Sequence, residues 1–132
     1  MDFLFLVGRI LFAVLFLGSG FAHFKAVDAM TGYAQFKKVP AARASVLLSG
    51  AVLILGGLSV LLGFHGEWGS LLLVLFLVPT AFLMHNFWTV EDAQAKMTEQ
   101  VAFNKDIALA GAALVLFWVF STVADLPLIL TK

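Results

Sequence analysis

The residues of this chain that could do chemistry gather at the ends of apolar stretches. The clearest group is "HNFW" (residues 85–88), an imidazole, a carboxamide and two aromatic rings that follow the apolar run "SLLLVLFLVPTAFLM". Imidazole and amide groups beside aromatic rings suit a quinone headgroup, whose carbonyls accept hydrogen bonds while its ring stacks on flat side chains. Polar residues at the ends of other apolar runs are expected at the same depth. The predicted ligand-binding residues are His23, His85, Asn86, Trp88 and Asn104.

Simpler explanations of the same residues stay open at this point. Tryptophan is typical of the aromatic belt at a membrane surface, and asparagine is common where a helix ends. His85 could satisfy a neighbouring carbonyl, and His23 with His85 could also be the two axial ligands of a haem. The chain has no cysteine, which excludes disulfides, thiol relays and iron–sulfur ligation by its own side chains. No HExxH or GxSxG pattern is present, so we expect no metal site and no covalently bound cofactor.

Arg9 is the one charged residue that lies clearly within an apolar stretch. A charge at the centre of a membrane helix is costly, but this arginine lies about two turns from the N-terminal end, from which it can reach outward. Asp125, Glu67 and Asp2 are expected near the same level. We therefore predict a structural ion pair, for instance between Arg9 and Asp125, with a lipid headgroup or another anionic ligand as the alternative.

The composition requires these residues to be positioned by membrane-spanning helices. Of 132 residues, 62% are hydrophobic and only 12% are charged, and the mean hydropathy is +1.04. A helix that crosses a bilayer needs about 20 mostly apolar residues. Four stretches qualify, at about 3–22, 45–64, 70–88 and 107–123. Because backbone polar groups in lipid must be satisfied within the segment, we predict an all-α integral membrane four-helix bundle that forms a single domain over residues 1–132.

The positive residues predict the orientation of this bundle. The two longer loops carry six lysines and arginines, whereas the opposite side has only Lys132. Since lysine and arginine mark cytoplasmic loops, we expect both termini on the extracytoplasmic side of the inner (plasma) membrane. Short interfacial helices are expected in both loops, from the apolar spacing of "AVDAMTGYAQFKKVP" and from "TVED" (residues 89–92), which has the form of a helix N-cap. The net charge of +0 suggests no nucleic-acid partner, and leaves the lipid bilayer and partner proteins of a membrane complex.

Four segments resemble the DoxX family of small bacterial four-helix membrane proteins. They are "GRILFAVLFLGSGFAHF", "VPAARASVLLSGAVLILGGLSVLLGF", "HNFW" and "FNKDIALAGAALVLF". The resemblance covers nearly the whole chain, and HNFW with the N-x-x-I-A-x-x-G pattern that follows it is its most specific part. It implies a link to redox and stress chemistry, since some relatives are associated with thiosulfate:quinone oxidoreductase. The positions it carries over are Arg9, His85, Asn86, Trp88 and Asn104.

Two positions depart from the family pattern. Relatives often have a glutamate just before the Gly-Gly of the second span, where this chain reads Leu53-Ile54-Leu55. A lysine is common at the end of the first span, where this chain has His23. Our main expectation is a small membrane subunit of a quinone-linked oxidoreductase or oxidative-stress assembly that binds a quinone headgroup at the cytoplasmic boundary. The alternative is a non-catalytic scaffold that stabilises a larger membrane complex.

Overall fold

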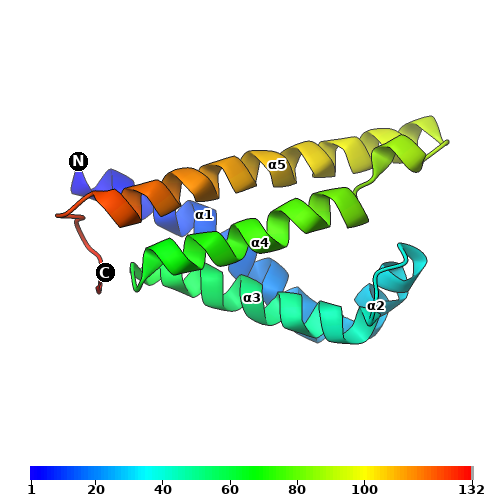
Figure 1. Ribbon diagram of the computed structural model, residues 1–132, viewed down its shortest axis with the longest axis horizontal. Helices are drawn as coiled ribbons and strands as arrows, with labels where there is room; N and C mark the ends of the chain where they lie inside the picture. Colours follow the sequence, from blue (N-terminus) through cyan, green and yellow to red (C-terminus); the bar gives the residue numbers. More distant parts are fainter. Residues whose placement is uncertain (132) are drawn as a thin grey trace.

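The structure is a computed structural model that describes residues 1–131, and its regular elements are all helical (Figure 1). Four helices are long and apolar enough to cross a membrane. They are α1 (Asp2–Lys25), α3 (Ala42–Leu62), α4 (Gly66–Met84) and α5 (Ala93–Thr122). The short helix α2 (Val27–Phe36) joins α1 to α3, and the 3-10 turn η1 (Phe87–Thr89) lies between α4 and α5. The predicted fold class, an all-α four-helix membrane protein, is confirmed at this level.

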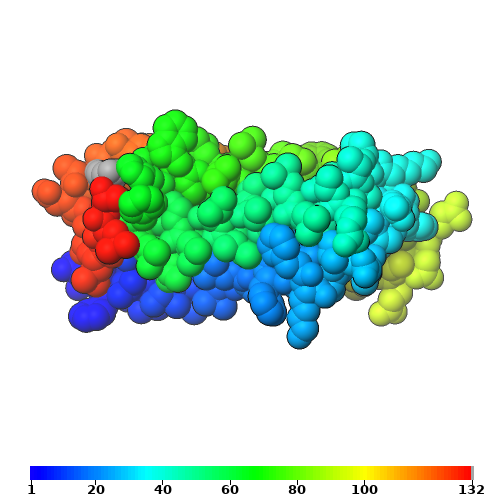
Figure 2. Space-filling model, turned by 90° about the horizontal axis from the view of Figure 1, so that it is seen from below, coloured from blue at the N-terminus to red at the C-terminus, as the bar shows by residue number. Residues whose placement is uncertain are grey.

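The long helices run up and down, so the connections gather at two ends. The N-terminus, the last described residues and the α3–α4 turn lie at one end of the molecule, which we call the termini end (Figure 1). The helix α2 and residues 85–92 lie at the opposite end, which we call the loop end (Figure 1). Figure 2 shows α1 and α3 side by side along one face, with the C-terminal residues against the start of α4.

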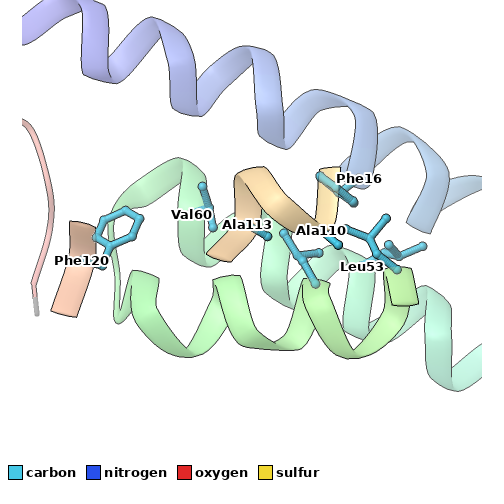
Figure 3. Packing of buried hydrophobic residues seen from close by; sticks show 8 residues of the cluster. Phe16, Leu53, Val60, Ala110, Ala113 and Phe120 are labelled. Carbon is cyan, nitrogen blue, oxygen red and sulfur yellow. The ribbon is translucent and has the colours of Figure 1, made fainter. Parts of the chain in front are cut away.

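Packing follows the chain, because α1 lies against α3, α3 against α4, and α4 against α5. The core between the helices is apolar and includes Phe16, Leu53, Ala110 and Phe120, each at most 4% exposed (Figure 3). Glycines set the closest helix contacts: a Cβ at Gly20 would lie 3.0 Å from the carbonyl oxygen of Gly50. Such close approach of backbones is how membrane helices associate without a hydrophobic force between them.

The outward faces of the helices are apolar too. Large exposed side chains include Leu11 on α1, Leu55 on α3, Leu75 on α4 and Val115 on α5. A water-soluble domain of this size would bury such residues, whereas a bilayer covers them. The chain is therefore a multi-pass membrane protein.

Helix ends differ from the predicted spans most at the loop end. The third span was expected to reach Trp88, but α4 ends at Met84, and residues 85–88 leave the helix. The fourth span was expected to begin at 107, but α5 begins at Ala93 and runs for 30 residues without a break. The short helix expected before that span is therefore its first turns.

The N-cap of α5 also differs from the expectation. Asp92 is the cap, and its carboxylate accepts a hydrogen bond of 2.9 Å from the backbone N–H of Ala95. Thr89 instead lies in η1, and its hydroxyl donates to the carbonyl of Asn86. The TVED motif was thus right about a helix start and wrong about which residue caps it.

Candidate functional site

The helices diverge at the loop end (Figure 1). A large cavity lies between them there. Its volume is about 790 Å³. All five helices contribute to its lining, and most of the lining is apolar, for instance Leu72, Phe76 and Leu83 of α4. This volume lies within the range of about 300–1,000 Å³ that is usual for small-molecule sites.

His23 and His85, predicted from the sequence at a similar depth, both line this cavity. His23 is on the last turn of α1, and its Nδ1 lies 2.7 Å from the carbonyl oxygen of Ser19. Since a carbonyl only accepts, Nδ1 carries the proton of this bond. In the neutral ring Nε2 is therefore an acceptor. Phe76 meets the His23 ring edge-on, with centroids 6.1 Å apart.

His85 lies between two carboxylates of α5. Its Nδ1 is 3.1 Å from Oε2 of Glu99, and its Nε2 is 3.6 Å from Oδ2 of Asp106. Glu99 and Asp106 are seven residues apart on one helix, which places them two turns apart on the same face. Because both ring nitrogens face carboxylates, neither is left to ligate a haem iron, so this geometry speaks against the bis-histidine haem alternative.

Glu99 is the centre of a polar network at the loop end. Its Oε1 accepts a hydrogen bond of 2.9 Å from the hydroxyl of Tyr33, and its Oε2 lies 3.8 Å from Nζ of Lys37. The side chain of Lys37 is only 8% exposed, and its ammonium also donates to Oδ1 of Asn86 at 2.9 Å. Lys37 is thus a nearly buried charge with partners, which is the condition under which burial of a charge is tolerated.

The network changes the acid–base behaviour of Tyr33. Burial, followed by the hydrogen bond to Glu99 and the negative charge of that carboxylate, raises the pKa of Tyr33 to about 12. The hydroxyl therefore stays protonated and remains a donor to Glu99 across the physiological pH range.

Asn86 faces a second cavity and not the first. This cavity has a volume of about 680 Å³ and is lined largely by polar residues, among them Lys37, Lys38, Thr98 and Glu99. The chain leaves the helix after Met84, and Asn86 lines this second cavity. Its role here is to hold Lys37.

Trp88 and Asn104 line neither of these two cavities. Trp88 is 50% exposed and packs in a cluster of four aromatic rings with Phe82, Phe87 and Phe103, with centroids 5.3–6.1 Å apart. This cluster fixes residues 85–89 against α5. Asn104 is exposed on α5.

Arg9 is on α1 and contacts the C-terminal segment at Leu128, so it lies at the termini end and away from the loop-end cavities, and it is 1% exposed. Its Nη2 donates to the carbonyl of Leu128, and its guanidinium carbon lies 4.9 Å from the ring centroid of Phe5. Within residues 1–131 no carboxylate forms an ion pair with it, and Asp125 is exposed. The expected ion pair is therefore not formed, because the C-terminal segment brings a backbone carbonyl to the guanidinium instead.

The family model named DoxX matches residues 4–86, which is more than half of the chain. The chain belongs to the DoxX family. No curated protein and no solved structure matches it. The DoxX match ends within HNFW, so it includes His23 and His85 but not α5, which supplies Glu99 and Asp106.

The sequence reasoning missed much of the network. Glu99, Tyr33, Lys37 and Asp106 were not among the predicted site residues of this DoxX protein. One signal was present: Glu99 and Asp106 share the seven-residue spacing of one helix face. This spacing could predict that the two carboxylates lie together only if α5 was known to begin before Glu99.

Proposed function

We propose that this DoxX protein binds a membrane quinone in the first cavity, as the small membrane subunit of a quinone-linked oxidoreductase or oxidative-stress assembly. The observation that carries the proposal is a single cavity whose walls are apolar and whose polar groups include His23, His85, Lys105 and Asp106. An isoprenoid quinone has the same division, because its headgroup is polar and its tail is apolar.

The polar groups of the cavity match a quinone headgroup in either redox state. The carbonyls of a quinone need hydrogen-bond donors, and the ammonium of Lys105 is one. The hydroxyls of a quinol need acceptors, which the carboxylate of Asp106 and Nε2 of a neutral His23 supply. Leu72, Phe76 and Leu83 offer apolar surface for the first part of the tail.

The sequence supports the orientation and the partner in this proposal. The loop end carries the excess of lysine and arginine, which favours a cytoplasmic position for the cavity mouth and a place in the inner membrane. The chain has no cysteine to hold an iron–sulfur centre, so electrons would come from a redox protein partner. This fits a subunit that binds the quinone while another subunit carries the redox centre.

Thermal protection by a short-chain quinone analogue tests the proposal. We expect the analogue to raise the Tm of the purified wild type and of Glu91→Gln, an exposed carboxylate on the same loop, but not that of His85→Ala. Equal protection of His85→Ala, or no protection of the wild type, would contradict the proposed site. No protection together with tight co-purification of a larger complex would favour the scaffold role.

A further inference from the structure

His85 lies between the two cavities of the loop end. His85 and Asp106 line the first, apolar cavity, and Glu99 lines the second, polar one. One ring nitrogen faces each carboxylate, at 3.1 Å for Glu99 and 3.6 Å for Asp106. An imidazole can accept a proton on one nitrogen and release one from the other, which makes this arrangement a route for protons between the cavities.

We propose that Glu99, His85 and Asp106 relay protons between the second cavity and the ligand of the first. This inference rests on the proposed quinone function, because reduction of a quinone to a quinol takes up two electrons and two protons. The electrons come from a redox protein partner, and the relay supplies the protons. Asp106 is the member that touches the ligand, and Glu99 acts through His85.

The proton movements balance along the chain of groups. The carboxyl of Asp106 gives its proton to the ligand oxygen, and its carboxylate is reprotonated by the Nε2–H of His85. A proton from water in the second cavity passes through the carboxylate of Glu99 to Nδ1 of His85, so Glu99 is a charged carboxylate before and after each passage. The ring then carries its proton on Nδ1, and exchange with water, which removes the Nδ1 proton and protonates Nε2, restores the starting tautomer before the next passage. Each passage moves one proton from the second cavity to the ligand.

Different charged and titratable side chains surround the two carboxylates of the relay. On the Glu99 side, Tyr33 of α2 donates to the carboxylate and Lys37 lies 3.8 Å from it. On the Asp106 side, Lys105 lies 3.8 Å from Oδ1, and His23 of α1 lines the same cavity. Tyr33 and Lys37 hold Glu99 beside Nδ1, and Lys105 offers a positive charge near the point where the proton is delivered.

A purely structural role for Glu99 is the alternative to a relay. Glu99 ties α2 to α5 through Tyr33, and loss of this tie alone could loosen the loop end. Tyr33→Phe removes the same hydrogen bond and keeps the carboxylate. It therefore distinguishes a proton-relay role of Glu99 from a purely structural role.

The test measures binding, proton delivery and carboxyl protonation in the whole protein in mild detergent. The probe is a short-chain quinone analogue, reduced by dithionite, and quinol formation is followed optically at neutral pH. For Glu99→Gln we expect the thermal protection of the wild type, quinol formation slowed by about a hundredfold, and recovery when formate is added as a small proton carrier. Glu91→Gln should form quinol at the wild-type rate, and Asp106→Asn should be slow. Tyr33→Phe should be slowed far less than Glu99→Gln, because it keeps the carboxylate. Infrared difference spectra should show a carboxyl band on reduction that Asp106→Asn lacks.

Each outcome decides between the two proposals. No quinone binding by the wild type overturns the proposed function and the relay with it. Binding in all variants, with a wild-type rate for both Glu99→Gln and Asp106→Asn, overturns the relay alone. An equal loss of rate in Tyr33→Phe and Glu99→Gln, without rescue by formate, also overturns it, because the defect then follows the tie and not the acid.

Discussion

Tyr33 is the sole tyrosine of the chain, so its ionisation can be followed without interference from other phenols. It connects the short helix α2 with Glu99 of α5, and the two bonded residues lie 66 positions apart in the sequence. The state of this hydroxyl therefore reports on whether the loop-end network is assembled.

Titration of tyrosinate absorbance should give a pKa of about 12 for Tyr33 in the folded protein. Glu99→Gln should lower this pKa toward the ordinary value of about 10, because the neighbouring negative charge is lost. The folded state holds the proton more tightly than the unfolded state, so the stabilisation is complete below about pH 10 and is lost as the pH rises toward 12. A pKa that is the same in the wild type and in Glu99→Gln would contradict the network.

The sequence could predict only those site residues whose position is determined by depth in the membrane alone. His23 and His85 were placed at one level by the ends of two apolar runs, and they share a cavity. The positions of Asn86 and Trp88 depend on how the chain turns after Met84, which hydropathy does not report. Whether Glu99 faces His85 depends on how the first turns of α5 are rotated about the helix axis. That rotation is set by tertiary packing.

At the scale of the helices, hydropathy identified all four spans but not their full lengths. The first turns of α5 are polar and fall below the threshold for a membrane span, yet the helix continues through them. Residues 93–110 contain no glycine or proline, so nothing in this segment breaks the helix. At 1.5 Å per residue, 30 residues span about 45 Å, longer than the roughly 30 Å hydrocarbon core, and the polar turns are the part that can extend beyond it.

The contact between α1 and α3 should depend on Gly20 and not on Gly18. A Cβ at Gly20 would lie 2.7 Å from Cγ1 of Ile54 and 3.0 Å from a backbone oxygen, whereas nothing lies within 4 Å of one at Gly18. Gly20→Ala should therefore destabilise the bundle by about 1–3 kcal/mol through overpacking. Gly18→Ala should be neutral or stabilising by up to about 1 kcal/mol, because alanine favours a helix. Unfolding in mild detergent measures both, and equal effects would show that the helices do not pack as described.

At the scale of the whole molecule, the fold makes a simple prediction about topology. The N-terminus and the described C-terminal residues lie together at the termini end, and the lysine-rich and arginine-rich connections lie at the loop end (Figure 1). The chain has no cysteine, which makes it a ready background for single-cysteine labelling.

Single cysteines should react from opposite sides of the membrane. We expect Asp125→Cys to react with a membrane-impermeant maleimide in cells whose inner membrane is intact, and Glu91→Cys only after that membrane is opened. Both positions are exposed in the structure, so a lack of reaction would not reflect burial. The reverse pattern would overturn the orientation and move the cavity to the extracytoplasmic side.

The central claim is that the loop-end cavity takes a quinone, and photo-crosslinking tests it most directly. An azido-quinone activated in purified protein should label residues of the cavity, such as Met30 of α2 and Met84 of α4, and excess unmodified quinone should abolish the labelling. Labels scattered over the outward apolar faces, and unaffected by competing quinone, would contradict the claim.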